Sequence, residues 1–390
     1  MKILRIIPSM DPKQGGPCQG IRNAIPELQK LEVYNEVVCL DDDNSEYLGQ
    51  DPFPIHTLGE GKTPWKYNKR LIPWLLGQFH RFDAVIIHGL WLYPSTAGIK
   101  AIVAHRKKNG ESPKVFVMPH GMLDPYFQKA KERRFKALRN DVYWKIFENK
   151  VVNQADGVFF TCEEELLLAR TTFPNYKPKK EINVGYGIQP PPAYKADMKQ
   201  AFAAKVPNWN GKPYLLFLSR IHPKKGVDLL IKAYLKLEKE LGNIPQLIIA
   251  GPGWDNSYGQ AMQQLASASP NIMFPGMLSG DAKWGAFYES EVFVLPSHQE
   301  NFGIAVVESL ACGKPVLISD KVNIWREITE GSGGIVQPDT FVGTENLLRK
   351  WFDLKAEQKQ DYANSAIGVY KKLYSIEMAA QAFSSSLLNN

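Results

Sequence analysis

Residues 294–320 read VLPSHQENFGIAVVESLACGKPVLISD. This stretch alternates a short apolar run, a polar loop, an amphipathic segment at 302–311 and a second apolar run at 315–318. Short apolar runs predict buried strands, whereas an apolar period near 3.6 residues predicts a helix. A strand, a helix and a second strand in this order predict a parallel βαβ unit.

The same alternation extends through the whole chain. In the first half the predicted strands are Ile3–Ile7, Glu36–Leu40, Asp83–His88, Lys114–Met118 and Gly157–Thr161. In the second half they are Tyr214–Leu218, Gln246–Ala250, Val292–Leu295 and Pro315–Ile318, with a helix predicted at Val227–Leu241. Strands that alternate with helices predict parallel sheets covered on both faces. The fold class is therefore α/β, with doubly wound sheets.

A linker divides this pattern in two. The stretch GYGIQPPPAYKAD at 185–197 contains three successive prolines, which continue neither a helix nor a central strand. We therefore expect one Rossmann-like domain at 1–190 and a second that begins at 191.

Composition excludes several classes of protein. The chain has 390 residues, of which 44% are hydrophobic and 22% charged, as in soluble globular proteins. No apolar run approaches the roughly 20 residues that a membrane span needs, and the N-terminus reads as a first strand rather than a signal peptide. The four cysteines form no CxxC pair, which suits a reduced, cytoplasmic protein and argues against a zinc site.

The net charge of +7 lies mostly in the first half, where residues 1–190 carry 27 basic and 21 acidic side chains. Much of the excess falls at 129–150, where aromatic residues recur among lysines and arginines in a predicted basic helix. One interpretation is contact with an anionic membrane surface or a lipid-linked acceptor. The alternative is a helix with its aromatic face in the core and its charges in water. Binding of nucleic acid is disfavoured, because no recognised motif is present.

Unusual residues follow the predicted strands of the first half. Gly15 and Gly16 follow the first strand and open a helix, where free amides favour an anion, although a plain tight turn would read the same way. His88 and His120 each precede a glycine at a strand end, and Trp91 lies close after His88. We expect a functional role for His120, whereas His88 could simply support the packing around Trp91.

Basic residues follow the first strand of the second half. Arg220, Lys224 and Lys225 occupy one short loop that ends at Gly226. A guanidinium and an ammonium that converge at a strand–helix loop suit a diphosphate, although a solvated basic loop would look similar. The next strand ends in a second glycine-rich loop, Gly251-Pro252-Gly253.

Two glutamates flank the helix of the opening stretch. Glu300 lies in the loop, and Phe302 and Gly303 precede the helix that carries Glu308. The amides of Gly303, Ile304 and Ala305 would be free donors at the helix N-terminus.

These motifs, in this order and spacing, resemble the retaining nucleotide-sugar glycosyltransferases of family 4, which have the GT-B fold. The resemblance spans nearly the whole chain and is strongest at Arg220 to Gly226, at Gly251-Pro252-Gly253 and at Glu300 to Glu308. It implies two Rossmann-like domains that face each other across a cleft. The acceptor domain would be 1–190, with the final helix 374–388 crossing back to it, and the donor domain would be 191–373.

The resemblance also implies roles for the residues. Arg220 and Lys225 would hold the donor diphosphate, helped by the amides of the Gly303 helix, while Glu300 would contact the transferred sugar and Glu308 the ribose hydroxyls. His120 would lie near the sugar and the acceptor. Donors of UDP or GDP are implied, with no metal and no further cofactor, and the run Asp41-Asp42-Asp43 reads as a solvated loop.

Two departures from the family pattern are visible. Pro17 directly follows the glycine pair, and Pro26 lies within the helix after it. These prolines put in doubt that the loop has the geometry usual in the family. The second strand opens with Tyr34-Asn35-Glu36 in place of the common Gly-His-Glu.

The leading hypothesis is an enzyme of polysaccharide biosynthesis that moves a sugar to a saccharide or lipid-linked acceptor, at the cytoplasmic side of a membrane. A nucleotide-sugar epimerase or a phosphorylase of the same fold is the alternative, and a basic nucleic-acid-binding protein is the non-enzymatic one. The sequence leaves the base, the sugar, the acceptor and the oligomeric state open.

Overall fold

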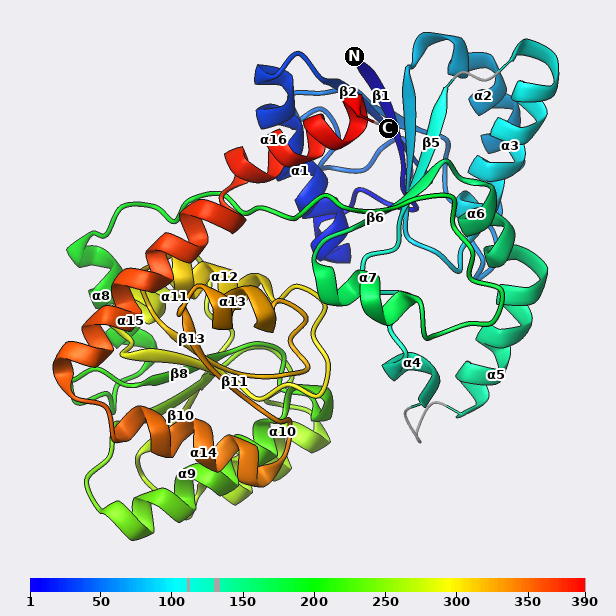
Figure 1. Ribbon diagram of the computed structural model, residues 1–390. Helices are drawn as coiled ribbons and strands as arrows, with labels where there is room; N and C mark the ends of the chain where they lie inside the picture. Colours follow the sequence, from blue (N-terminus) through cyan, green and yellow to red (C-terminus); the bar gives the residue numbers. More distant parts are fainter. Residues whose placement is uncertain (111–112, 130–133, 390) are drawn as a thin grey trace. The chain divides into compact units, whose positions relative to one another are not determined.

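The computed structural model describes residues 1–110, 113–129 and 134–389, and these fall into two compact units. Unit 1 contains Met1–Gly187 and Ile376–Asn390, and unit 2 contains Ile188–Ser375. Each unit is built on one parallel sheet with helices packed against it (Figure 1). The expectation of doubly wound α/β sheets is confirmed.

Unit 1 has a seven-stranded sheet in the order β3-β2-β1-β4-β5-β6-β7. Its strands are β1 (Lys2–Ile6), β2 (Tyr34–Cys39), β3 (Ile55–Thr57), β4 (Ala84–His88), β5 (Lys114–Met118), β6 (Gly157–Phe160) and β7 (Glu181–Asn183). Neighbouring strands pair in parallel throughout the described part of this sheet. A parallel pair needs a crossover connection, which explains why most successive strands are separated by a helix.

The helices of unit 1 arise from segments far apart in the chain. They are α1 (Gly16–Lys30), α2 (Leu71–Gln78), α3 (Tyr93–Asn109), α4 (Tyr126–Lys129), α5 (Arg134–Tyr143), α6 (Asn149–Gln154), α7 (Glu163–Ala169) and α16 (Ile376–Leu388). The last of these lies beside α1, so that the red and blue ends of the chain meet in Figure 1.

Both faces of this sheet are buried, because successive side chains of a strand point to opposite sides. Val85 and Ile87 of β4 join the apolar cluster that packs against α2, α3 and α6. Ala84 and Ile86 join a second cluster, to which α1 contributes Leu28 and α16 contributes three residues. The final helix is therefore part of the core of unit 1.

Unit 2 has a six-stranded parallel sheet in the order β10-β9-β8-β11-β12-β13. Its strands are β8 (Leu215–Leu218), β9 (Leu247–Ala250), β10 (Ile272–Gly276), β11 (Val292–Leu295), β12 (Val316–Ser319) and β13 (Gly334–Gln337). The outermost strands of both sheets, β3, β7, β10 and β13, were not predicted from the sequence.

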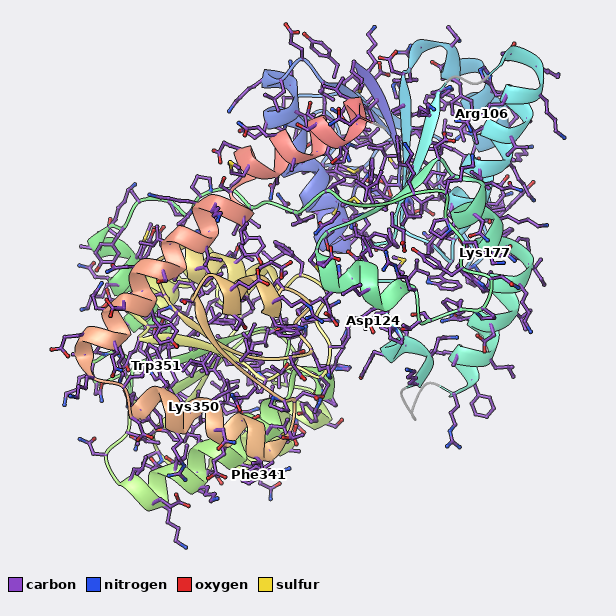
Figure 2. All side chains as sticks on the ribbon, in the orientation of Figure 1. Arg106, Asp124, Lys177, Phe341, Lys350 and Trp351 are labelled. Carbon is purple, nitrogen blue, oxygen red and sulfur yellow. The ribbon has the colours of Figure 1, made fainter. Side chains whose placement is uncertain are left out.

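The helices of unit 2 cover its sheet. They are α8 (Ala196–Lys205), α9 (Val227–Leu241), α10 (Ser257–Ala266), α11 (Gly280–Glu289), α12 (Ile304–Ala311), α13 (Trp325–Glu330), α14 (Phe341–Phe352) and α15 (Ala356–Val369). The predicted helix at 227–241 agrees with α9 at both ends. Trp351 of α14, labelled in Figure 2, is buried, and its indole Nε1 donates to Glu291 at 2.9 Å. This bond ties α14 to the loop before β11.

The first helix, α1, forms despite its two prolines. Pro17 lies in the first turn of α1, where its missing N–H would have no intrahelical acceptor in any case. Pro26 lies inside the helix, which nevertheless continues to Lys30. A proline there removes one backbone bond, and the buried Ile21 and Ile25 hold the helix on the sheet.

The basic helix predicted at 129–150 agrees with the structure over its described part, which is helical without a break from Arg134 onward. The described part consists of α5, a π-helical segment (Trp144–Glu148) and α6, while Lys131 and Arg133 lie outside the described residues. Trp144 is buried, as the packing interpretation expects, but Phe135 is 92% exposed. In the part of the chain that the structure describes, no helix combines the length and the apolar character that crossing a membrane requires.

A buried carboxyl group joins this region to α3. Glu148 is fully buried and accepts hydrogen bonds from the amide of Trp91 at 2.9 Å and from the Ser95 hydroxyl at 3.1 Å. Burial raises the pKa of Glu148 to about 7, and these two bonds oppose the shift only in part.

Glu148 should therefore make unit 1 sensitive to pH. The folded carboxyl group keeps its proton to a higher pH than the unfolded one, so the free energy of unfolding falls as pH rises from about 4 to about 7. Glu148→Gln should abolish this fall and gain roughly 3 kcal/mol over the wild type across that range. Urea unfolding at several pH values measures the difference. Glu46→Gln, at an exposed position of the same unit, is the control, and parallel pH profiles of Glu148→Gln and the wild type would contradict the assignment.

Two helical glycines of unit 2 test its packing. A Cβ on Gly285 of α11 would overlap the carbonyl oxygen of Met198 in α8, whereas a Cβ on Gly368 of α15 meets nothing within 4 Å. We expect Gly285→Ala to lower the free energy of unfolding by about 1–3 kcal/mol through overpacking. Gly368→Ala should raise it by about 0.5–1 kcal/mol. Equal urea midpoints for the two variants would show that α8 and α11 are not closely packed.

Candidate functional site

Most of the predicted site residues lie at or after the strands where each sheet reverses its order, whereas His120 follows β5 and Gly251 and Gly253 follow β9. In unit 2 the order reverses between β8 and β11, and in unit 1 between β1 and β4. At such a point the connections leave toward opposite faces of the sheet, and ligands bind beyond the carboxyl ends of the strands.

In unit 2, the loop after β8 is held by its neighbours. The amide of Ile221 donates to Pro252 O at 2.9 Å, and that of His298 donates to Lys224 O at 2.8 Å. Gly226 has a φ of +67°, and a Cβ there would overlap the carbonyl oxygen of Pro296. Only glycine therefore lets the loops after β8 and β11 approach this closely.

An ion pair connects these two loops. Lys225 is buried, and its Nζ contacts a carboxylate oxygen of Glu300. The backbone of Glu300 is fixed in turn, because its amide donates to Lys321 O at 2.9 Å and its carbonyl accepts from Asn323 N at 2.9 Å. The structure thus brings together two predicted site residues that are 75 positions apart.

Arg220 lies in the same loop with its side chain exposed. Its guanidinium forms no hydrogen bond or ion pair with the residues that the structure describes. Burial, together with the charges of Arg220, Lys224 and Lys225, lowers the pKa of the neighbouring His222. The loop therefore presents net positive charge, which favours an anionic ligand.

The helix after Glu300 begins as expected. Gly303 is the N-cap of α12 with a φ of +78°, and its carbonyl accepts from the amide of Val306 at 2.8 Å. The amides of Gly303, Ile304 and Ala305 lie at the start of the helix, where no preceding carbonyl of the helix can accept from them. Their hydrogens are therefore available to a ligand. Phe302 packs edge-on against Tyr374, at 5.6 Å between ring centroids.

Glu308 has a partner that the sequence did not indicate. Its carboxylate accepts from Lys283 Nζ of α11 at 2.6 Å. Burial raises the pKa of Glu308, and the charge of Lys283 opposes the shift. Glu308 is thus a part-buried, oriented acceptor on the helix that follows the Lys225–Glu300 pair.

Gly251 and Gly253 serve the packing of the loops. A Cβ on Gly251 would overlap the carbonyl oxygen of Ser219, and one on Gly253 would lie 2.8 Å from Ile221 O. Both residues have positive φ values, +144° and +92°. These glycines therefore let the loops after β8 and β9 lie side by side.

In unit 1, Gly15 and Gly16 form the start of α1. Gly15 is the N-cap with φ +90° and ψ −143°, a conformation that is essentially restricted to glycine. A Cβ on Gly15 or Gly16 would meet nothing within 4 Å, so the space around these residues is open.

His88 and His120 are in contact. His88 Nδ1 lies 2.9 Å from His120 Nε2, and the two rings are nearly parallel. Arg5 of β1 reaches the other side of His88, with Nη1 at 3.1 Å from Nε2, and donates from Nε to Asn35 at 2.9 Å. The resulting chain, Asn35–Arg5–His88–His120, crosses three neighbouring strands and ends in the loop after β5.

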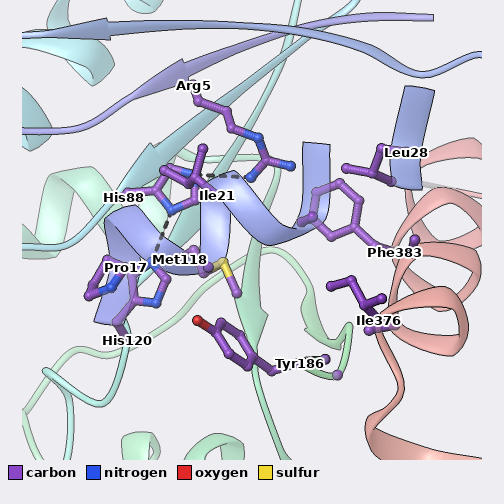
Figure 3. A pocket seen from close by; sticks show the side chains of 16 residues that line it. Arg5, Pro17, Ile21, Leu28, His88, Met118, His120, Tyr186, Ile376 and Phe383 are labelled. Carbon is purple, nitrogen blue, oxygen red and sulfur yellow. Dashed lines mark hydrogen bonds between the residues drawn. The ribbon is translucent and has the colours of Figure 1, made fainter. Parts of the chain in front are cut away.

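This chain borders a small cavity of about 50 Å³. Figure 3 shows Arg5, His88 and His120 along one side, with Phe383 of α16 beside the guanidinium. Most of the remaining lining is apolar, contributed by α1, β5 and α16.

Trp91 is part of the packing of unit 1. It has a φ of +71°, packs against Phe173 at 5.5 Å between ring centroids and donates its amide to Glu148. The Asp41 to Asp43 run is engaged locally, since Asp41 accepts from the amide of Met10 at 2.7 Å and Asp43 from the hydroxyl of Thr57.

Sequence reasoning missed Arg5, Lys283 and Glu165. Glu165 is buried and accepts from the amide of Gly121 at 2.5 Å, which holds the turn that carries His120. A signal for Arg5 was present, because it is the one charged residue between apolar neighbours in the stretch ILRII. Nothing comparable distinguishes Lys283, which lies on α11 with no recognisable motif around it.

Two family models match the chain. One, described as glycosyl transferases group 1, matches residues 198–367, and the other, described as a glycosyl transferase 4-like domain, matches residues 15–179. Together they cover most of unit 2 and most of the first segment of unit 1.

Among curated proteins, an uncharacterized glycosyltransferase of Methanocaldococcus jannaschii is 29% identical over 142 residues, 35% of this chain and 36% of the relative. A GDP-mannose-dependent alpha-(1-6)-phosphatidylinositol monomannoside mannosyltransferase of Mycolicibacterium smegmatis is 23% identical over 271 residues, 64% of this chain and 68% of the relative. For the first several relatives, the chain spans about a third to a half of their length.

Solved structures match over the full length. A glycosyltransferase of Rickettsia africae has a TM-score of 0.74 at 15% identity and covers 100% of this chain and 99% of its own. HepE of Anabaena, in complex with UDP and glucose, has a TM-score of 0.72 at 16% identity, with 100% of both chains covered. This likeness concerns the fold, while the matched models identify the family. The chain belongs to the group 1 glycosyl transferases and has their two-domain α/β GT-B fold.

Proposed function

We propose that the protein is a retaining glycosyltransferase, which moves a sugar from a nucleoside diphosphate to a hydroxyl group of a saccharide or a lipid-linked glycan. The observation that carries this proposal is the convergence of Arg220, the Lys225–Glu300 pair and the N-terminus of α12 beyond the strands β8 and β11. Family membership supports a nucleotide sugar as the donor.

The cations of this site would carry most of the catalysis. A diphosphate gains negative charge as it leaves the sugar, and preorganised donors stabilise that charge without reorganisation. Arg220 is exposed and unpaired by described residues, Lys225 lies next to Glu300, and the amides of Gly303, Ile304 and Ala305 add neutral donors. With this charge compensation in place, we propose that no metal ion is needed. Full activity in excess EDTA would support this.

The two glutamates would bind the donor at different points. Glu300 would contact the transferred sugar, since its carboxylate lies next to the cation proposed for the diphosphate. Glu308, oriented by Lys283, would accept hydrogen bonds from the ribose hydroxyls. The loops around Gly251 and Gly253 would complete the donor site.

Unit 1 would bind the acceptor. His120 would contact the sugar and the acceptor, with His88 behind it, and the open space above Gly15 and Gly16 would admit a phosphate or the acceptor itself. Trp91 would support this side through its packing rather than through direct contact.

The proposed reaction breaks one bond, forms another and moves one proton. The bond between the anomeric carbon and the diphosphate oxygen breaks, and the acceptor oxygen bonds to the same face of that carbon. The proton of the acceptor hydroxyl passes to the departing diphosphate. Because HepE holds UDP and a relative uses GDP-mannose, UDP and GDP are the first nucleotides to test by thermal stabilisation, with ADP as the comparison.

The cationic loop gives the first prediction on activity. Arg220→Ala removes a charge-assisted contact worth about 1.5–3 kcal/mol, so kcat/KM should fall roughly 10- to 100-fold. For Lys225→Ala, kcat/KM should fall at least as far, because this change also leaves Glu300 without its partner. Release of nucleoside diphosphate in the presence of acceptor measures both variants.

Lys212→Ala is the matched control, since Lys212 is an exposed cation of the same unit. Wild-type turnover in Arg220→Ala and Lys225→Ala would refute their roles. Isomerisation of the donor sugar without acceptor would indicate an epimerase, and use of inorganic phosphate as the acceptor would indicate a phosphorylase.

We also propose that unit 1 contacts an anionic membrane surface. Phe135, Leu138 and Val142 of α5 are exposed at spacings of three and four residues, so they form one stripe along the helix, and Ile146 of the π-helical segment is exposed next to them. Lysines and arginines flank this apolar stripe: Arg134, Lys136, Arg139 and Lys145. An apolar stripe with basic margins suits the interface of an anionic bilayer.

Removal of the stripe should release the protein from lipid. We expect the wild type to float with vesicles that contain anionic lipid and to lose this binding at high salt. The double variant Phe135→Ser, Leu138→Ser should bind at least tenfold more weakly, because each exposed side chain loses its burial in the interface. Val342→Ser, at an exposed apolar position of unit 2, should bind like the wild type. No flotation of the wild type would refute the membrane contact.

A further inference from the structure

Arg5 is a buried cation without a carboxylate partner among the described residues. Its side chain lies on the central strand β1 and is 3% exposed. It contacts Asn35, His88 and, through its guanidinium, the ring of Phe383 at 5.1 Å from the centroid. A buried charge is costly unless it is paired. The residues that Arg5 contacts therefore indicate what it is for.

The chemistry of the guanidinium fixes the direction of the chain of hydrogen bonds. Arginine has donors only, so Arg5 Nη1 donates and His88 Nε2 accepts. A neutral imidazole has one N–H, and in His88 it must therefore lie on Nδ1. That nitrogen faces His120 Nε2 at 2.9 Å, so His88 donates and His120 accepts.

The same reasoning fixes His120. Because its Nε2 accepts a hydrogen bond, its proton lies on Nδ1. Within the described part of the chain, Nδ1 of His120 has no hydrogen-bond partner, and the side chain is only half-buried. His120 therefore presents an N–H donor to whatever binds there.

Resting on the glycosyl transfer proposed above, we propose that Arg5 is a positioning residue, which sets the tautomers of His88 and His120 so that His120 donates from Nδ1 to a hydroxyl oxygen of the bound sugar. In this arrangement His120 is not a general base, because its accepting nitrogen is already engaged by His88. The chain instead acts as a fixed dipole directed at the substrate.

The protonation states agree with this geometry. Burial, together with the charge of Arg5, lowers the pKa of His120 to about 4, and burial places that of His88 well below its usual value. Both rings are thus neutral at physiological pH, as the chain requires.

The ends of the chain are held in place. Asn35 is buried, accepts from Arg5 and donates to Val33 O at 2.9 Å, so it cannot turn away from the guanidinium without losing both bonds. At the other end, His120 has a φ of +52°, and Glu165 binds the amide that follows it. Figure 3 shows the part of the chain from Arg5 to His120, with Phe383 beside the guanidinium.

The tautomers can be observed without any assay of activity. The protein has seven histidines, so ¹⁵N-histidine labelling gives a simple long-range ¹H–¹⁵N spectrum. Loss of one signal set in His120→Gln assigns His120, and loss of another in His88→Gln assigns His88. We expect both rings to be neutral with the proton on Nδ1. A proton on Nε2 of His120 in the wild type would overturn the proposal, whether or not the protein transfers sugar.

Variants of Arg5 test its control over the chain. Arg5→Met removes the hydrogen-bond donor at similar side-chain volume. The Nε2–H form of His88 should therefore appear in the spectrum, and with it the Nε2–H form of His120. Arg5→Lys, which keeps a donor, should restore part of the Nδ1 population. Unchanged tautomers in a folded Arg5→Met would overturn the role of Arg5. If Arg5→Met does not fold, the histidine tautomers of Arg5→Lys, compared with those of the wild type, still test the role of Arg5.

Kinetics separate positioning from stability. Arg5→Met should lower kcat at least tenfold, while thermal stabilisation by UDP or GDP stays unchanged, since the nucleotide is proposed to bind unit 2. Arg22→Met is the matched control, because it removes a part-buried arginine of unit 1 that pairs with Asp51. An equal loss of kcat in Arg22→Met would assign the effect to stability. Absence of transfer by the wild type with every donor would refute the proposed function and leave the spectrum as the test of the chain.

Discussion

Parallel pairing is the constraint on which the rest of this structure depends. Because the described strands of each sheet run in one direction, their carboxyl ends meet at one edge, and most crossovers return through a helix. The loops after β8 and β11 leave toward opposite faces, which brings Lys225 and Glu300 together across 75 positions of sequence. In unit 1 the neighbouring strands β1, β4 and β5 supply Arg5, His88 and His120 in the same way. The candidate site is thus a consequence of topology rather than of local sequence.

The same constraint decides which strands could be predicted. A central strand of a parallel sheet is buried on both faces and reads as an uninterrupted apolar run, so β4, β5, β9 and β11 were predicted to within a residue of their bounds. The outermost strands pair on one side only and need no such run: β3 reads IHT and β7 reads EIN, with no fully buried residue in either. A pattern search based on apolar runs cannot find such strands.

The site divides along a similar line. Arg220, Lys225, Glu300 and the start of α12 could be predicted because each belongs to a short motif at a strand end. Their partners could not, since Lys283 meets Glu308, and Arg5 meets His88, only after the sheets have formed. Asn35 stands at the start of β2 in place of the family's usual residues, and its contact with Arg5 gives a physical reason for this departure. Its side-chain oxygen accepts from Arg5 and so compensates part of the cost of a buried guanidinium.

The place of α16 in unit 1 has a consequence for biosynthesis. Unit 1 is encoded in two pieces, with all of unit 2 between them. Chains fold as they emerge from the ribosome, and the N-terminal domain usually folds first. Here Phe383 and Leu387 complete the apolar cluster around Ile3 and Leu28, so that face of the first sheet stays partly uncovered until the last helix has been made. Unit 2, which is continuous in sequence, can finish folding earlier, and the half of the protein that is translated first is therefore the half that matures last.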